Sequence, residues 1–276
     1  MLARSLLAVV LLVGSAAGAV GQTVSSGGLS AHIDALGSLD YRTRMNAARM
    51  IRRAPAPEAV AALKAAIRGH TDQFVRYRAF VLLTAFNDRE TAALVGELLR
   101  DSNDRLREAA YKWLEQHPQP AMTGTLLAAL QTEQAEFVRP ALVGALAALG
   151  EDPRVQKALV AEVPRGLDFF RSAVIDALGR HRARYAVAAI AEVAALQGPL
   201  QDDAVLALGR IGGDEARRAL AALEHPPRDV ALTVRAAECL MGERCAEHVK
   251  ALAEAAGSAT IVSTLRAATD ALGAVA

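Results

Sequence analysis

A pattern that recurs at a nearly constant interval is the feature that most constrains the fold of this chain. An anchor residue, Arg in all but one case, returns every 30 to 34 residues in a stretch with helical spacing of apolar residues. The anchors are Arg44, Arg76, Arg107, Arg139, Arg171, Gln201, Arg235 and Arg266. A fixed period in this range is typical of a solenoid, whose repeats bury their apolar faces against one another.

The anchors lie on the second helix of each helix pair, and the first helix of each pair is predicted between successive anchors. The predicted ranges are 57–69, 89–100, 120–131, 153–163, 184–196, 214–224 and 246–256. No stretch alternates as a strand would, and the short connections require neighbouring helices to pack antiparallel. The sequence therefore predicts an all-α solenoid of about eight helix pairs, an α-solenoid that occupies residues 30–276.

The residues around the anchors resemble a known family. An acid stands three or four positions before five of the anchors, in the pairs Asp40–Arg44, Asp72–Arg76, Asp104–Arg107, Glu136–Arg139 and Asp168–Arg171. The helix endings Ala177-Leu178-Gly179 and Ala207-Leu208-Gly209 complete the pattern. Together they resemble the HEAT-repeat superfamily, and most closely its short bacterial phycobilisome-lyase-type form. The resemblance implies a right-handed superhelix, second helices on the concave side, and a structural ladder of these Asp, Glu and Arg residues between repeats.

The first residues are typical of an export signal. Arg4 precedes an apolar run over residues 6–13, and Ala17-Gly18-Ala19 fits a small-residue cleavage site. We expect a signal peptide over residues 1–21 and a flexible leader over residues 22–29, since Ser and Gly there disfavour a helix. The mature protein is then exported, periplasmic or secreted, with no integral membrane segment. An uncleaved N-terminal anchor is the alternative.

The two cysteines, Cys239 and Cys245, flank a predicted turn at Gly242. In an oxidising compartment a disulfide across this turn is the favoured interpretation. Two free thiols are the second possibility. A metal site that includes His248 is the third, although no fourth ligand stands nearby.

Composition and motifs exclude several functions. The net charge of +1 and the aromatic content of 4% argue against nucleic-acid binding. Hydrolase, metalloprotease and phosphate-loop motifs are absent, as are the His-Glu pairs of HEAT-repeat hydroxylases. We therefore predict no catalytic residues, no metal, no cofactor and no enzymatic activity.

A basic stripe is predicted on the second helix of the first repeat. Arg42, Asn46, Arg49 and Arg53 share one helix face, and Tyr41, Met45, Ala48 and Ile51 are expected on an opposite face toward the core. Such a stripe suits an acidic partner. It is equally consistent with a solvated end that prevents repeats from stacking end to end.

The basic stripe is predicted to continue into an apolar middle of the groove. Residues 140–149 contain no polar side chain. On the anchor register Val81, Gly144 and Ala148 align with Arg49 and Arg53. Lys112 lies between them, and Arg78 adds a cation. A shallow groove of this kind could receive an extended or helical peptide. Alternatively, Ala and Gly here only allow close packing and tight curvature.

These observations predict a non-enzymatic scaffold of the cell envelope that binds another protein, through an acidic or amphipathic segment, along its concave face. A divergent lyase-like enzyme, a small-molecule carrier and a purely structural spacer are the alternatives. The last helix lacks the polar residues of a terminal cap. It therefore either folds back on its neighbour or forms a homodimer contact.

Overall fold

The computed structural model describes residues 26–223, 228–258 and 262–273. Sixteen α-helices in these residues form eight consecutive pairs. The first helices of the pairs are α1 (Ser26–Ala35), α3 (Ala56–Gly69), α5 (Thr91–Leu98), α7 (Thr123–Thr132), α9 (Pro153–Glu162), α11 (Val187–Ala195), α13 (Gly213–Ala221) and α15 (Cys245–Ser258). The second helices are α2 (Tyr41–Arg53), α4 (Gln73–Leu83), α6 (Asp104–Gln116), α8 (Arg139–Ala147), α10 (Asp168–Arg180), α12 (Gln201–Ile211), α14 (Arg228–Leu240) and α16 (Val262–Gly273). Short 3-10 turns η1 (Thr84–Phe86), η2 (Pro120–Met122) and η3 (Arg184–Ala186) precede α5, α7 and α11.

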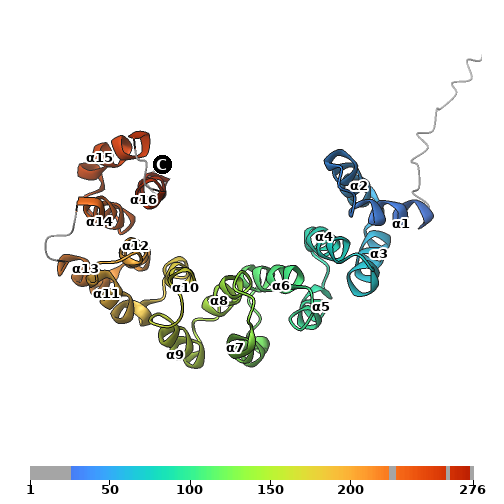
Figure 1. Cartoon of the computed structure of the whole chain (residues 1–276), viewed down its shortest axis with the longest axis horizontal. Coiled ribbons are helices and arrows are strands. Elements are labelled where there is room, and N and C mark those ends of the chain that lie inside the picture. Colours follow the sequence, from blue (N-terminus) through green and yellow to red (C-terminus); the bar gives the residue numbers. More distant parts are fainter. Residues whose placement is uncertain (1–25, 224–227, 259–261, 274–276) are drawn as a thin grey trace, which may run out of the picture.

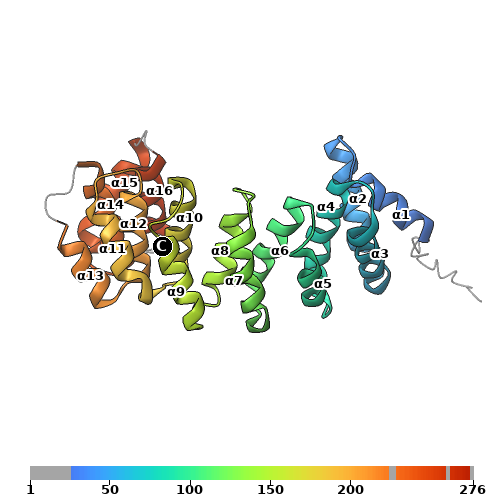
Figure 2. The ribbon, with the colours of Figure 1, turned by 60° about the horizontal axis from the view of Figure 1, so that its bottom comes forward.

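The helix pairs stack side by side into an open arc (Figures 1 and 2). Second helices line the inner, concave side and first helices the outer side (Figure 1). From α4 onward each second helix packs against the next one along the chain. The predicted all-α solenoid is confirmed, and its predicted helices coincide with the observed ones within a few residues.

The helix starts follow from local capping. Asp40 accepts a hydrogen bond from the Thr43 backbone N–H at 2.7 Å, and Asp72 accepts one from Phe74 N–H at 2.7 Å. Asn103 and Asp152 cap α6 and α9 in the same way. Each side chain satisfies a backbone donor that the first helical turn leaves without a partner. One anchor is out of register, since Arg235 lies in the middle of α14 and not in its first turn.

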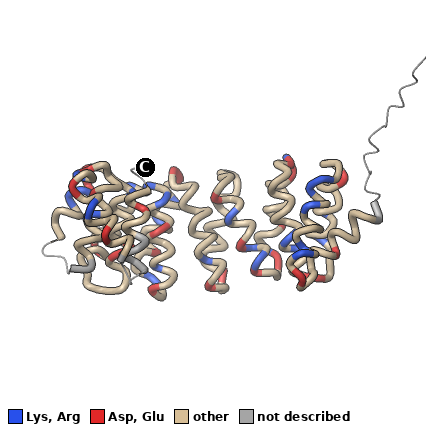
Figure 3. Tube along the Cα trace, turned by 90° about the horizontal axis from the view of Figure 1, so that it is seen from above, with Lys and Arg blue, Asp and Glu red and all other residues tan. Residues whose placement is uncertain are grey.

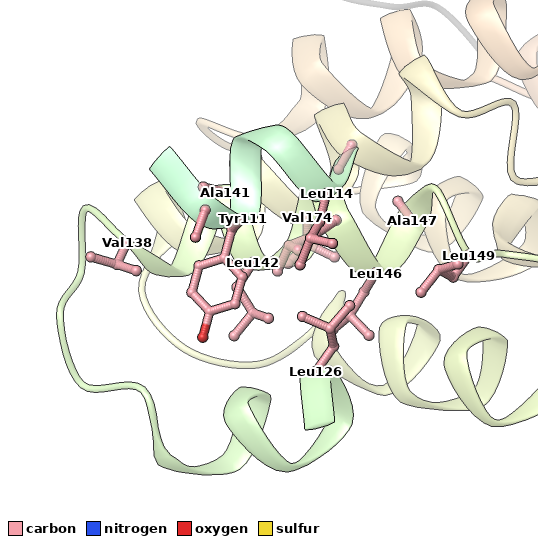
Figure 4. Packing of buried hydrophobic residues seen from close by; sticks show 14 of the residues in the cluster. Tyr111, Leu114, Leu126, Val138, Ala141, Leu142, Leu146, Ala147, Leu149 and Val174 are labelled. Carbon is pink, nitrogen blue, oxygen red and sulfur yellow. The ribbon is translucent and has the colours of Figure 1, made fainter. Parts of the chain in front are cut away.

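The apolar run over residues 140–149 is a core element. All seven residues from Ala141 to Ala147 are buried, because α8 lies between α6 and α10 and also packs on α7 and α9. Leu142 and Leu146 contact the surrounding cluster with Tyr111, Leu126 and Val174 (Figure 4). The predicted apolar middle of a groove is therefore wrong, and the alternative of close packing is correct.

The two ends of the chain differ from their predictions in part. The signal peptide and the start of the leader lie outside the described residues. The leader was expected to reach residue 29, whereas α1 begins at Ser26. Helix formation there is favoured by burial of Leu29, Ile33 and Leu36 in the core. At the other end α16 packs on α14 and α15, and Ala267, Ala268 and Ala271 on it are buried.

In the described part of the chain, no helix combines the length and the apolarity that crossing a membrane requires.

Candidate binding groove

The second helices of the first two repeats, α2 and α4, are held apart, and a cleft lies between them. α2 packs on α1 and α3 but hardly contacts α4. The C-terminal end of α1 lies in this region, where Arg78 of α4 donates a hydrogen bond to the Leu36 carbonyl at 3.0 Å. Gly37 follows, and a Cβ there would lie 2.8 Å from Asp72 Oδ2 and 2.9 Å from Val75 Cγ2. The end of α1 is thus fixed against the start of α4.

The cleft between α2 and α4 has a volume of about 220 Å³ and is lined mainly by apolar and aromatic side chains. Its lining residues are Leu36, Tyr41, Arg44, Met45, Ala48, Tyr77, Arg78, Val81 and Leu82. Three of them are large apolar groups open to solvent: Tyr41 is 65% exposed, Met45 42% and Val81 47%. Exposed apolar groups gathered in one concavity are typical of a binding surface.

A second cleft, between α4 and α6, continues the first. It has a volume of about 280 Å³ and shares Tyr77 and Val81 with the α2–α4 cleft. Trp113 and Lys112 of α6 also line it. We call the two connected clefts the N-terminal groove. Its floor is aromatic and apolar, and among the described residues no carboxylate lines it.

The cations of the N-terminal groove are held in place. Arg44 donates to the carbonyls of Ser38 at 2.9 Å and Leu39 at 2.7 Å. The Arg78 guanidinium lies 4.0 Å from the ring centroid of Phe74, a cation–π geometry. Burial and the nearby Arg44 lower the pKa of Arg78 from its ordinary value, but an arginine remains charged at any physiological pH. The groove therefore presents fixed positive charge beside apolar surface.

The predicted basic stripe lies on a different face of α2. Arg42, Asn46, Arg49 and Arg53 are exposed, but they do not line the N-terminal groove. Their side chains form no hydrogen bond or ion pair with any described residue. Instead, Tyr41 and Met45, which were expected to face the core, face the groove, because α4 does not cover them. Ala48 and Ile51 of the same set are buried as expected.

The other predicted binding residues fall into two groups. Arg78 and Val81 line the α2–α4 cleft, and Val81 and Lys112 line the α4–α6 cleft. Gly144 is buried and Ala148 is half-buried, so the structure does not bring them to the groove. Gly144 is covered by Glu115, whose Oε2 would lie only 2.6 Å from a Cβ at that position. Placing Gly144 in the site was wrong for this reason.

The anchor arginines connect successive repeats, but not through the acids that precede them. Arg76 pairs with Asp101, Arg107 with Glu133 at 2.8 Å and Arg139 with Glu162 at 3.8 Å. Each of these acids lies at the end of the next repeat's first helix. The hydrogen bond from Arg107 lowers the pKa of Glu133 and raises that of Arg107.

Within the predicted acid–Arg pairs, ion pairs form only between Asp104 and Arg107 and between Asp168 and Arg171. Asp40 and Asp72 cap helices instead, because the start of a helix offers unpaired N–H groups. Arg171 donates to the Val163 carbonyl at 3.1 Å, and Gln201 donates to Ala194 at 2.9 Å from the same place in its repeat. Gln201 therefore stands where other repeats have an arginine, and it keeps the hydrogen bond to the preceding helix.

The family described as HEAT repeats matches residues 29–111. This range contains the α2–α4 cleft and ends within α6, before Lys112 and Trp113 of the α4–α6 cleft. The same helix-pair architecture continues to α16. Residues 29–111 of this chain are therefore similar to HEAT repeats. The narrower assignment to the phycobilisome-lyase-type form stays a prediction.

Among solved structures, human deoxyhypusine hydroxylase in complex with glycerol is similar to this chain. The two are 21% identical, the match covers 80% of this chain and 98% of the hydroxylase, and the TM-score is 0.38. A search of curated proteins gives no significant match. HEAT repeats in general mediate protein–protein interactions, and most members of the family are not enzymes.

A chain of ion pairs crosses the concave side of the solenoid beyond the groove. Glu115 of α6 passes over α8 to reach Arg180 and His181, the latter at 3.1 Å. Asp176 then pairs with Arg180 at 3.0 Å and with Arg210 at 2.9 Å, and Arg210 also pairs with Asp270 of α16. Residues of both charge signs therefore lie close together in this part of the solenoid (Figure 3).

This compensated network gives the central and C-terminal concave surface a different character from the N-terminal groove. The hydrogen bond from His181 lowers the pKa of Glu115, with a further contribution from Arg180. The carboxylates and the guanidinium groups are already engaged by one another. They are therefore less available to a partner than the exposed side chains of the groove.

The cysteine pair lies at the turn between α14 and α15. Cys239 and Cys245 are at disulfide-bonding distance, with Cα atoms 4.4 Å apart. His248 Nε2 lies 2.6 Å from a carboxylate oxygen of Glu238, so this ring nitrogen already has a partner within the protein. This contact argues against a metal site that includes His248. Among the described residues no group of three or more potential ligands is placed to hold a metal ion.

The sequence pattern did not predict four of the groove residues, which are Tyr41, Met45, Tyr77 and Trp113. One signal could have pointed to them. The chain has only 6 Phe, 4 Tyr and 1 Trp, and most of these lie between residues 41 and 113. A concentration of scarce aromatic residues in three repeats marks these repeats as different from the others.

Proposed function

We propose that this chain is a non-enzymatic scaffold that binds a segment of another protein in the N-terminal groove. The observation that carries the proposal is the cleft between α2 and α4, where Tyr41, Met45 and Val81 are exposed beside fixed cations. The matching partner segment is amphipathic and acidic, with apolar side chains for the cleft and carboxylates for Arg44 and Arg78. Arg42, Arg49 and Arg53 add positive potential that speeds the approach of such a segment.

The test starts from a displayed peptide library with the mature chain as bait, followed by fluorescence anisotropy on the enriched peptides. We expect the peptides to combine acidic with aromatic or aliphatic residues. Val81→Glu should weaken their binding by about tenfold or more, as expected for a central apolar contact. The matched control is Leu196→Glu, since Leu196 is 64% exposed and lies at the end of α11, away from the groove. Failure to enrich any peptide, or equal binding by Val81→Glu, contradicts the proposal.

We also propose that the protein is exported. The proposal is supported by the charge and apolar pattern of residues 1–21 and by a cysteine pair at bonding distance, which suits an oxidising compartment. Residues 1–25 fused to a reporter that is active only outside the cytoplasm should give activity. Thiol titration of the unreduced, unfolded protein from its native compartment should find no free thiol. An inactive fusion with two free thiols would contradict export.

A further inference from the structure

A cavity of about 390 Å³ lies at the turn that joins α4 to α5, next to the N-terminal groove. It shares Thr84, Asn87, Trp113 and His117 with the α4–α6 cleft. The proposed function does not use this cavity. Its volume is within the range of small-molecule sites.

The start of α5 supplies hydrogen-bond donors to the cavity. The Thr91 N–H donates to the Asp88 carbonyl at 3.1 Å, but the N-cap residue Glu90 makes no capping hydrogen bond. The next N–H groups of the first turn, which have no partner within the helix, are therefore left without a capping side chain. The Glu90 carboxylate is instead held by Lys64 at 2.6 Å. Ala92, in the first turn, lines the cavity. These donors and the helix dipole favour an anion at this place.

Thr91 provides an independent indication of a ligand. Its side chain is 3% exposed, it lines the cavity, and its Oγ1 has no hydrogen-bond partner. A buried hydroxyl without a partner is unfavourable, since it has lost its bonds to water. An acceptor in the cavity would satisfy it.

The charges around the cavity suit a single negative charge. Arg89 lines the cavity, is exposed, and forms no ion pair with any described residue. Asp88 also lines it, but its carboxylate is paired with Lys64 at 2.6 Å. One uncompensated cation and a helix N-terminus match a carboxylate better than the double charge of a phosphate.

A flat aromatic wall closes one side of the cavity. The rings of Trp113 and His117 stack with centroids 4.4 Å apart and an interplanar angle of 12°. The His117 Nδ1 is 3.0 Å from the Trp113 carbonyl and donates to it, which fixes the ring. A planar or apolar group packs well against such a surface.

We propose that this cavity binds the carboxylate of a ligand whose adjoining body is flat or apolar. The carboxylate accepts from the first turn of α5, from Thr91 Oγ1 and from Arg89, and the body lies against Trp113. The ligand is either a small free acid or the C-terminal residue of a peptide that continues into the N-terminal groove. Both offer the same chemistry to the cavity.

The test uses Trp113, the one tryptophan of the chain, as a fluorescent reporter. Benzoate should change its emission in a saturable way, and benzamide, which has the same shape without the charge, should not. Arg89→Gln and Thr91→Val should each weaken benzoate binding about fivefold, as expected for a partly exposed charged hydrogen bond. The matched control is Arg100→Gln, because Arg100 is an exposed arginine just after the other end of α5. Equal responses to benzoate and benzamide, or unchanged binding by Arg89→Gln, overturn the proposal.

A second arm identifies the source of the carboxylate. The groove-binding peptides are compared with free and with amidated C-termini, on the wild-type protein and on Arg89→Gln. Tighter binding of the free form, lost in Arg89→Gln, supports a peptide C-terminus, whereas benzoate binding alone supports a small acid. Val81→Glu should leave benzoate binding unchanged. This separates failure of the groove from failure of the cavity.

Discussion

Between α2 and α4 the second helices are held apart, whereas between α10, α12 and α14 they touch backbone to backbone. A Cβ on Gly179 would lie 2.9 Å from the Ala207 Cα, and one on Gly209 would lie 2.6 Å from the Ala237 Cα. The carboxyl-terminal repeats thus bury their second helices on both sides. The first repeat leaves Tyr41 and Met45 uncovered.

The first repeat also lacks a link that the second, third and fourth repeats each make to the repeat that follows. Arg76, Arg107 and Arg139 tie the second to fifth repeats through the acids at the ends of the following first helices. Arg44, the anchor of the first repeat, bonds only to carbonyls of its own preceding loop. In a solenoid, stability is a sum of repeat and interface terms. Arg171 of α10 likewise bonds only within its own repeat, so the missing contact between α2 and α4 is what leaves the apolar side chains of α2 free for a partner.

The largest effect is expected from replacing a buried tyrosine. If the groove is open as described, the buried Tyr111 should contribute far more to stability than the exposed Tyr41. Tyr111→Ala should lower the free energy of unfolding by about 3–5 kcal/mol, because Tyr111 is fully buried beneath α8. Tyr41→Ala should change it by less than about 0.5 kcal/mol, since Tyr41 lies open in the groove. Urea unfolding followed by circular dichroism measures both. Similar losses for the two variants would mean that α2 is packed like the other second helices.

The close approach of α12 and α14 gives the next effect. Gly209→Ala should destabilise the protein by up to about 3 kcal/mol, because the added methyl meets the backbone of Ala237 and the helices must move apart. The matched control is Gly124→Ala in α7, where nothing lies within 4 Å of the new Cβ. There the helix propensity of alanine should stabilise by about 0.5–1 kcal/mol. Thermal unfolding of both variants would show opposite signs, and equal signs would contradict the contact.

Most of the fold could be predicted from the sequence because the same pattern of apolar and anchor residues recurs in each of the eight helix pairs. Anchor spacing located the helix pairs, and errors in one repeat were corrected by the others. The site was harder to predict, since it depends on where the repetition fails. No local pattern distinguishes Tyr41 and Met45 on an uncovered helix from the same residues facing a core. Their exposure follows from the gap between α2 and α4.

The register after residue 200 shows the same limit. Arg235 was assigned as an anchor, but it lies in the middle of α14. The apolar segment around Gly144 was ambiguous for a related reason, because a chain of ion pairs from Glu115 to Arg180 covers it. These residues are 65 positions apart, and periodicity within 30 residues carries no information about such a contact.

The smallest effect concerns this cover over α8 and its dependence on pH. The hydrogen bond from His181 lowers the pKa of Glu115 below its ordinary value of 4.5, with Arg180 contributing. The unfolded chain then binds the proton more readily than the folded one, so Glu115 stabilises the fold above pH 4.5 and loses that effect as pH falls through the lowered pKa. Glu115→Gln should lower the free energy of unfolding by about 1 kcal/mol at pH 7 and by much less at pH 3. Urea unfolding of both proteins at the two pH values measures this. A loss of unfolding free energy that is the same at both pH values would mean that Glu115 acts over Gly144 through its shape and not its charge. In that case the ion pairs on the concave side would not distinguish the closed part of the solenoid from the open groove.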